Sequence, residues 1–339
     1  MTNLTFKDFK SDQEVRWCPG CGDHAVLAAL QRALPLVSQA LGYEKERYVV
    51  VSGIGCSSRL PYYMDTYGFH SIHGRATAIS TGIKVANPDL TVWQACGDGD
   101  ALAIGGNHFI HAIRRNVDIN IMLFNNQIYG LTKGQYSPTS KFGAITKTSP
   151  YGTVEHPFNP GSLVLGAKGT FFARSLDVEL KLNQEIMTAA ALHDGCSVME
   201  FLTNCVIFND GAHKDLSDPA VKADHTILLR QGEKMIFGRN RDKGLVYDGK
   251  KIRVVTIGQD GVTEDDILVH DSHADDMGIH MALADMKGPD YPVALGVIRD
   301  VKDITYDDGV RDQVLDVMKK SKIHCVDDLL HSGSTWEVE

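Results

Sequence analysis

Short runs of apolar, often β-branched residues alternate with helix-like segments along the first two hundred residues. The runs at 48–52, 90–95 and 119–124 are typical of buried strands, and the small-residue segment 73–88 between two of them is typical of a helix. Continuous apolar strands separated by helices indicate βαβ units, in which helices cover both faces of a parallel sheet. The alternation therefore predicts an α/β fold built on a parallel sheet, with Asp23 as the expected N-cap of its first helix.

The sequence changes character at about residue 210. Downstream it is polar and acidic, and only two strand-like runs stand out, at 252–257 and 292–298. We therefore predict an α/β domain over residues 1–210. Residues 211–339 are predicted to be a C-terminal extension that packs on this domain or on a partner subunit.

Charge and hydropathy exclude several classes of function. The chain has 34 Lys and Arg against 43 Asp and Glu, a formal net charge of −9, without a basic tract that would suit nucleic acid or an anionic membrane surface. No apolar run reaches the roughly 20 residues that a membrane-spanning helix needs. The first residues, MTNLTFKDFKSDQEVRW, lack the apolar segment of a signal peptide, so we expect a cytoplasmic protein.

Three of the predicted strands end in unusual loops. These are GIGCSSR at 53–59, GDGD at 97–100 and NNQIYG at 125–130. Ligands of open parallel sheets bind outside the carboxyl ends of the strands, and these ends lie at the same edge. We therefore expect the three loops to converge on one site.

The second and third loops together suit a divalent cation and a diphosphate. Glycines at 97 and 99 let the backbone approach a diphosphate, and the helix that follows offers N–H donors. Mg²⁺ prefers carboxylate, amide and carbonyl oxygens, which Asp98, Asn126 and the carbonyl of Ile128 can supply. Either fragment alone is better explained as an ordinary turn, but the two at successive strand ends indicate a metal–diphosphate site.

Seven cysteines in a chain without a secretion signal argue against a disulfide framework. The one C-x-x-C pair, Cys18 and Cys21, suits a zinc site, a redox dithiol or half of an iron–sulfur site. No second Cys or His pair completes a zinc site, whereas Cys56 and Cys205, both in loops at strand ends, complete the four thiolates of a [4Fe–4S] cluster. The other cysteines are expected to be core or incidental residues: Cys96, Cys196 and Cys325.

Four motifs in this order, WCPGCGDH, GIGCSSR, GDG and NNQIYGLTKGQYSPTS, resemble the β subunits of 2-oxoacid:ferredoxin oxidoreductases over about residues 10–215. The resemblance implies a thiamine diphosphate-binding α/β domain with Mg²⁺ and one [4Fe–4S] cluster. It implies oxidative decarboxylation of a 2-oxoacid with coenzyme A as co-substrate and ferredoxin as electron acceptor, with 2-oxoglutarate favoured. It also implies an α subunit as partner, in a dimer of heterodimers.

The same resemblance assigns residues to each group. It implies that Mg²⁺ is bound by Asp98, Asn126 and the carbonyl of Ile128. It implies that the cluster is bound by Cys18, Cys21, Cys56 and Cys205. The residues implied to contact thiamine diphosphate are Ile54, Gly55, Cys56, Ser57, His73, Gly97, Gly99, Asp100, Asn126, Gly130, Leu131 and Thr132. Catalytic roles fall to Arg59, His73 and Leu131.

Arg59 is the expected anchor for the substrate carboxylate, because its planar guanidinium offers two parallel donors. The family carries a basic residue here, often Lys, and the alternative is a surface Arg paired with Asp65. Leu131 is a candidate wall for the substrate side chain, and His73 taken alone suits a structural histidine as well. Two other functions stay open from the residues: a thiamine enzyme without electron transfer, and a non-enzymatic zinc-binding assembly subunit.

Overall fold

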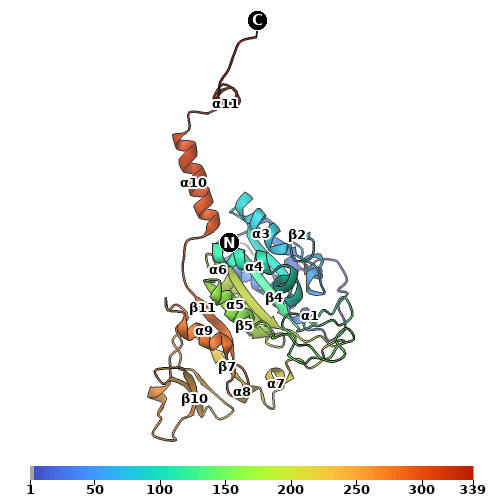
Figure 1. Ribbon diagram of the computed structural model, residues 1–339, viewed down its shortest axis with the longest axis vertical. Helices are drawn as coiled ribbons and strands as arrows, with labels where there is room; N and C mark the ends of the chain where they lie inside the picture. The colour runs from blue at the N-terminus through green and yellow to red at the C-terminus, as the bar shows by residue number, and fades with distance from the viewer. Residues whose placement is uncertain (1–3, 339) are drawn as a thin grey trace.

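A computed structural model describes residues 4–338 and shows one large twisted sheet flanked by helices (Figure 1). Eight strands follow the order β2-β1-β3-β4-β6-β5-β11-β7, and the six from β2 to β5 run parallel to one another. Their bounds are β1 Tyr48–Ser52, β2 Tyr67–His70, β3 Thr91–Gly97, β4 Asn120–Asn125, β5 Phe171–Leu176, β6 Ser197–Leu202, β7 Thr226–Leu229 and β11 Val293–Asp300. The predicted α/β class is confirmed.

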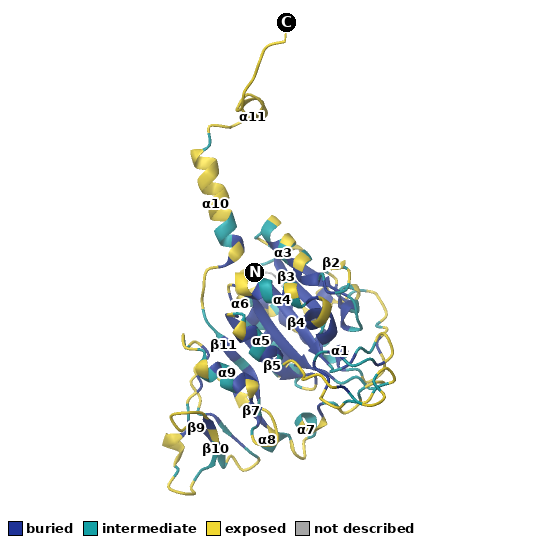
Figure 2. Ribbon diagram, viewed as in Figure 1, coloured by how far each residue is buried: buried dark blue, intermediate teal, exposed yellow. Residues whose placement is uncertain are grey.

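Helices cover both faces of the sheet, because successive strand residues point to opposite sides. Val49 and Val51 pack into the core under α3, α4, α5 and α9, whereas Tyr48 and Val50 pack into the core under α1 and α6. Figure 2 shows the central strands of the sheet, among them β3, β4 and β5, in the dark blue of buried residues. The helix bounds are α1 Asp23–Leu41, α2 Leu60–Tyr63, α3 Ala76–Ala86, α4 Gly106–Arg115, α5 Pro160–Gly166, α6 Leu180–Leu192 and α9 Gly278–Asp285.

The C-terminal part contributes to the main sheet as well as packing on it. β11 pairs antiparallel with β5, and β7 pairs parallel with β11. The remaining elements are short helices, a small antiparallel sheet and a projecting arm: α7 Lys214–Ser217, α8 Lys222–His225, β8 Ile236–Phe237, β9 Lys243–Tyr247, β10 Ile252–Thr256, α10 Tyr306–Lys320 and α11 Val326–Leu330. The division into domains at 1–210 and 211–339 stays a prediction, with two strands of the second part completing the edge that β5 would otherwise expose.

The first helix departs from its prediction at its start. Gly22, not Asp23, is the N-cap residue, and no side chain caps the helix there. Asp23 is helical and buried, with 2% of its surface exposed. The helix continues past Pro35 to Gly42, whose φ of +70° gives the left-handed conformation that commonly ends a helix.

No helix in the described residues has the length and apolar content needed to cross a membrane.

Candidate cofactor site

The three predicted loops meet at the carboxyl edge of β1, β3 and β4. Ile54 N, after β1, donates a hydrogen bond to Asp100 Oδ1, after β3, at 3.1 Å. Tyr129, after β4, donates its hydroxyl hydrogen bond to the carbonyl of Gly99 at 3.1 Å. The predicted convergence of the loops is therefore present in the structure.

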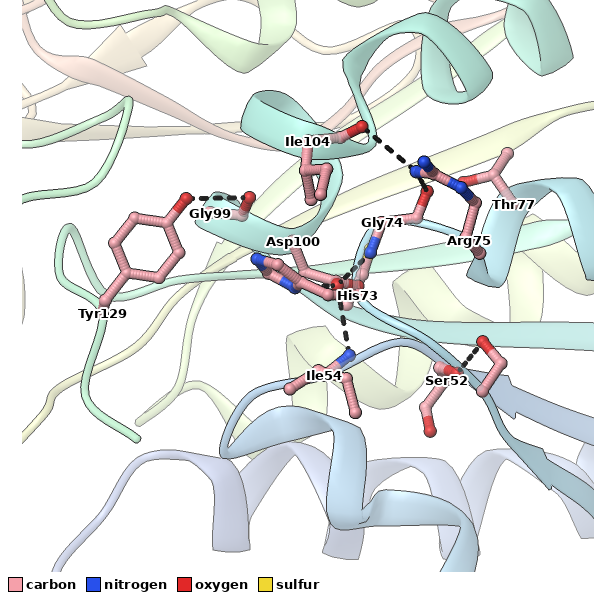
Figure 3. A network of polar contacts seen from close by, with 12 residues as sticks. Ser52, Ile54, His73, Gly74, Arg75, Thr77, Gly99, Asp100, Ile104 and Tyr129 are labelled. Carbon is pink, nitrogen blue, oxygen red and sulfur yellow. Dashed lines mark hydrogen bonds and ion pairs between the residues drawn. The ribbon is translucent and has the colours of Figure 1, made fainter. Parts of the chain in front are cut away.

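Asp100 joins two of these loops and the turn before α3 (Figure 3). Its Oδ1 accepts hydrogen bonds from Ile54 N, from Gly74 N at 2.7 Å and from His73 Nδ1 at 2.7 Å. The carboxylate is 2% exposed, whereas the His73 side chain is 34% exposed. The hydrogen bond to Asp100 uses Nδ1 of His73, and the ring lies edge-on to that of Tyr129, with the centroids 6.2 Å apart.

Gly99 is required by a close approach. A β-carbon at this position would lie 2.1 Å from the Tyr129 ring, so any side chain would displace the ring. The backbone then makes one π-helical turn, Asp100–Ile104, before α4 begins. Such turns occur mostly as single interruptions and often at functional sites. The turn carries Asp100 to the loop after β1 and to the turn before α3.

Asp98 is a buried carboxylate with no cationic partner among the described residues. It is 2% exposed, and its Oδ2 accepts hydrogen bonds from Ser137 Oγ and Thr139 Oγ1, each at 2.5 Å. Burial raises the pKa of Asp98, and the two hydroxyls lower it only in part. A carboxylate in this position fits a bound divalent cation, which would supply the missing positive charge.

The loop after β4 holds the other predicted magnesium ligands in a strained conformation. Asn126 Oδ1 accepts a hydrogen bond from the backbone N–H of Ile128 at 3.2 Å. Between them Gln127 has a φ of +56°, a conformation that residues other than glycine adopt rarely and that is enriched at functional sites. Asn209 holds the loop from outside by donating to the carbonyl of Asn126 at 2.9 Å.

A buried polar chain leads from Asp98 into the core and was missed by the sequence reasoning. Thr139 Oγ1 lies 2.9 Å from Asn125 Oδ1, and Asn125 Nδ2 donates to Glu200 Oε1 at 2.7 Å. Glu200 in turn accepts from Arg174 Nε at 2.6 Å, and both of these side chains are almost fully buried. The hydroxyl-rich SPTS at 137–140 was the only sequence signal for this chain.

The predicted cluster cysteines gather beside the same loop. A β-carbon on Gly130 would lie 3.5 Å from Cys205 Sγ and 3.7 Å from Cys56 Sγ. Burial raises the pKa of Cys56 to about 11, and the negative charges of Asp23, Cys205 and Cys18 add to this rise. The pKa of Cys21 is raised in the same way, first by burial and also by Cys205 and Cys56. Cys56 is thus electrostatically coupled to Cys18, Cys21 and Cys205.

No group of three or more His, Cys, Asp and Glu side chains in residues 4–338 is arranged to hold a single metal ion. A [4Fe–4S] cluster differs from a single ion because each of its irons takes its own thiolate, so the four sulfurs surround the cluster at wider spacing. All seven cysteines are free thiols, with Cys96 and Cys196 buried in the core and Cys325 exposed in the C-terminal arm. The gathering of four thiols thus fits a cluster better than a single ion.

The predicted substrate residues lie around the rim. Arg59 Nη1 donates to the carbonyl of Arg16 at 3.1 Å, and Asp65 pairs instead with Lys45 at 2.7 Å. Leu131 is 41% exposed in the Tyr129–Gln135 hairpin. Arg59 is therefore not held by the acid that was its alternative partner, and the positive charge of its guanidinium opposes in part the rise in the pKa of Cys56.

A cavity of about 700 Å³ lies between the sheet and the C-terminal region, and Gln127 of the loop after β4 is part of its lining. Asn125, Arg174 and Glu200 form part of its wall, together with Phe158 and His213. None of the residues predicted to contact the cofactor lines it. Those residues lie instead in the loops after β1, β3 and β4 and in the turn before α3, from buried Ser57 and Asp100 to exposed Leu131 and Thr132.

Residues 53–201 match the family of thiamine pyrophosphate enzymes through their C-terminal TPP-binding domain. Over 336 residues the chain is 48% identical to 2-oxoglutarate oxidoreductase subunit KorB of Mycobacterium tuberculosis, covering 98% of this chain and 88% of that one. It is 48% identical over 189 residues to 2-oxoglutarate synthase subunit KorB of Archaeoglobus fulgidus, covering 56% of this chain and 69% of that one.

A solved structure is similar over almost the whole chain. It is the 2-oxoglutarate:ferredoxin oxidoreductase from Magnetococcus marinus with 2-oxoglutarate, coenzyme A and succinyl-CoA bound. The TM-score is 0.77 at 31% sequence identity, and the match covers 99% of this chain and 98% of that one. The similarity therefore includes the C-terminal region as well as the sheet.

Proposed function

This chain belongs to the β subunits of 2-oxoacid:ferredoxin oxidoreductases, and we propose that its enzyme oxidatively decarboxylates 2-oxoglutarate with coenzyme A and passes the electrons to ferredoxin. The observation that carries the choice of substrate is the 48% identity to a 2-oxoglutarate oxidoreductase subunit over nearly the full chain. The solved relative with 2-oxoglutarate and coenzyme A bound supports the same substrates.

The rim residues would bind the cofactor by its diphosphate. Asp98, Asn126 and the Ile128 carbonyl would hold Mg²⁺ against the diphosphate, and the turn of Gly97 and Gly99 would let the backbone approach it. When bound, thiamine diphosphate supplies the electron sink for loss of CO₂ from the 2-oxoacid. The remaining proposed contacts are Ile54, Gly55, Cys56, Ser57, His73, Asp100, Gly130, Leu131 and Thr132.

Three side chains would orient the substrate. Arg59 would bind its carboxylate through two parallel N–H donors. Leu131, exposed on the hairpin, would contact the substrate side chain. His73 would present its other ring nitrogen to the bound groups, with the hydrogen bond to Asp100 fixing the ring and holding the proton at Nδ1.

We also propose that Cys18, Cys21, Cys56 and Cys205 bind one [4Fe–4S] cluster. The position of Gly130 against two of the sulfurs supports this, because it brings the cluster beside the hairpin that carries cofactor contacts. Cys18 is exposed, so this side of the cluster would face the electron acceptor. Ferredoxin as acceptor makes the cytoplasm the proposed location.

An α subunit would complete the site over the rim. Exposed apolar side chains lie on α2, on β2 and on the turn that follows β2: Tyr62 is 53%, Tyr67 62%, Phe69 53% and Ile72 72% exposed. Large exposed apolar side chains in neighbouring segments are typical of a protein interface. We propose that the α subunit supplies the other half of the cofactor site, including the activating Glu.

The test is anaerobic co-expression of this chain with its α subunit. We expect about four irons per β chain, bound thiamine diphosphate, and ferredoxin reduction that depends on coenzyme A and is faster with 2-oxoglutarate than with pyruvate. Turnover without electron transfer would instead support a carboligase or decarboxylase. One zinc per chain and no thiamine diphosphate would support an assembly subunit.

Asp98→Ala tests the metal assignment in the same complex. Because Asp98 is the only buried carboxylate proposed for Mg²⁺, the variant should lose Mg²⁺-dependent binding of thiamine diphosphate in calorimetry. The visible absorbance of the cluster should stay, since the thiols are separate ligands. Cofactor affinity equal to that of the wild type would remove Asp98 from the site.

A further inference from the structure

The two oxygens of the Asp98 carboxylate have different surroundings. Oδ2 accepts hydrogen bonds from Ser137 Oγ and Thr139 Oγ1, each at 2.5 Å. An ionised carboxylate has about four acceptor sites, two on each oxygen, so the two hydroxyls fill those of Oδ2. Among the described residues, no side chain donates a hydrogen bond to Oδ1. Asp98 therefore offers a cation one free oxygen rather than two.

A tight turn holds the two hydroxyl groups in place. The backbone N–H of Ser137 donates to Ser140 Oγ at 2.8 Å, and Ser140 N donates to the carbonyl of Ser137 at 3.0 Å. Pro138 stands between the two hydroxyl residues, and its ring fixes the backbone φ there. Ser137, Thr139 and Ser140 are all buried. The turn therefore keeps the Ser137 and Thr139 hydroxyls directed at Asp98.

The same turn is tied to the loop that carries the other proposed ligands. Ser140 Oγ donates at 2.6 Å to the carbonyl of Gln127, the residue that separates the two proposed ligands of that loop. Thr139 Oγ1 lies 2.9 Å from Oδ1 of Asn125, at the end of β4. One turn thus contacts both groups of ligands and restrains the distance between them. Such a site has little freedom to adjust to ions of different size.

Rigid sites and single carboxylate oxygens favour small cations. Mg²⁺ requires near-ideal octahedral geometry with oxygens at about 2.0–2.1 Å. Ca²⁺ takes about 6–8 oxygens at about 2.3–2.6 Å in flexible geometry, and it accepts both oxygens of one carboxylate. We propose that Ser137 and Thr139 determine the metal specificity of this site, because they occupy one oxygen of Asp98 and so favour Mg²⁺ over Ca²⁺. The inference rests on the proposed function, since it takes Asp98 as a ligand of the cation that binds the diphosphate.

A purely structural role of the two hydroxyls would have a different consequence. If they only stabilised the turn, removal of either would loosen the loops and weaken the binding of Mg²⁺ and Ca²⁺ by the same factor. Because they occupy Oδ2, removal instead frees this oxygen for a second bond to the larger ion, so Ca²⁺ gains relative to Mg²⁺. The ratio of the two affinities therefore separates the two roles, whatever happens to stability.

The test is calorimetric titration of the co-expressed α/β enzyme, freed of divalent cations by a chelator, with Mg²⁺ and separately with Ca²⁺ in the presence of thiamine diphosphate. The variants are Ser137→Ala and Thr139→Val, each of which removes one hydroxyl and keeps most of the side-chain volume. We expect each to lower the ratio of Mg²⁺ affinity to Ca²⁺ affinity by about tenfold, the scale of one hydrogen bond to a charged group. The double variant should lower the ratio further.

Thr203→Val is the matched control. Thr203 directly follows β6 and is fully buried, and its Oγ1 has no hydrogen-bond partner among residues 4–338. Its backbone N–H donates to the carbonyl of Asn125 at 3.0 Å, so the same substitution is made beside the same network. The control should keep both the affinity ratio and the thermal unfolding temperature of the wild type.

A wild-type affinity ratio in both Ser137→Ala and Thr139→Val would overturn the proposal, even if both cations bound more weakly. An equal change of the ratio in Thr203→Val would overturn it as well. Asp98→Ala separates this inference from the proposed function. If that variant loses the binding of both cations while the hydroxyl variants keep the ratio, only the inference about specificity fails. If it binds both cations as the wild type does, Asp98 is not a ligand and the proposed metal site fails with it.

Discussion

Among single substitutions at the cofactor rim, Asp100→Ala should most destabilise the loop after β1 and the turn before α3. One buried oxygen accepts from Ile54 N, Gly74 N and His73 Nδ1, so the variant removes three hydrogen bonds to a charged group. Each such bond contributes about 1.5–3 kcal/mol. Because the three share one acceptor, their losses are not additive, and we expect a total loss of about 3–5 kcal/mol.

The assay is amide hydrogen exchange read by mass spectrometry on the purified complex. Peptides that contain Ile54 or Gly74 should exchange about 10- to 100-fold faster in Asp100→Ala, which corresponds to about 1.4–2.8 kcal/mol at each amide. Asp100→Asn keeps an acceptor oxygen but loses the charge, so it should show an intermediate increase. His73 also loses its fixed orientation in Asp100→Ala.

Asp118→Ala is the matched control, because it breaks a pair with Lys84 at the opposite edge of the sheet. It should lower the unfolding temperature without changing exchange at Ile54 and Gly74. Equal exchange of the two rim peptides in Asp100→Ala and in the wild type would refute the role of Asp100 as the residue that joins the loops.

Glu200→Leu leaves the buried Arg174 without its ion-pair partner, so it should lower the free energy of unfolding by about 3–5 kcal/mol, measured as a lower thermal unfolding temperature. The double variant with Arg174→Met should recover part of this loss of stability. A double variant as unstable as the single one would contradict the pairing. Burial raises the pKa of Tyr48 to about 12 from its ordinary 10.0. The neutral form of Tyr48 therefore contributes about 2–3 kcal/mol to the free energy of unfolding. This contribution is fully present below pH 10 and is lost as the pH rises through 12. The Tyr48→Phe variant should not lose this stability at alkaline pH, as measured by unfolding curves at several pH values. A loss equal to that of the wild type would refute the role of Tyr48. Cys205→Ser should lose iron in elemental analysis while Cys196→Ser keeps it, and the reverse result would contradict the cluster assignment.

The parallel part of the fold could be predicted because its strands are buried on both faces. β1, β4 and β6 consist mostly of apolar residues, with Glu200 as the one charged residue among them, and every one of their residues is buried. β2 could not be predicted, since all four of its residues are exposed and only its backbone pairing with β1 makes it a strand. The antiparallel pairing of β11 with β5 joins segments more than a hundred residues apart, a choice that local pattern does not encode.

The candidate site could be predicted where a local motif carries its chemistry. The turn around Asp98 and the loop at Asn126 could be recognised in the sequence as candidate ligand-binding loops, because each directly follows the end of a strand. Thr139 and Glu200 were missed because their role depends on burial and on contacts across the fold, with Thr139 meeting Asp98 from 41 positions away. Asp23 was misassigned for the same reason, since its type suits a cap but its position beneath the loop of Cys21 buries it.

The hairpin Tyr129–Gln135 couples the two groups of proposed ligands. Backbone hydrogen bonds from Tyr129 N to the Gln135 carbonyl (2.8 Å) and from Gly134 N to the Tyr129 carbonyl (2.9 Å) close it. The Tyr129 ring packs on Gly99 at the proposed diphosphate turn, while Gly130, the next residue, faces the sulfurs of Cys56 and Cys205. The two ligand groups therefore cannot move independently. A side chain larger than a methyl at position 130 would enter the space between the two sulfurs and, through Tyr129, disturb the turn that holds Asp98.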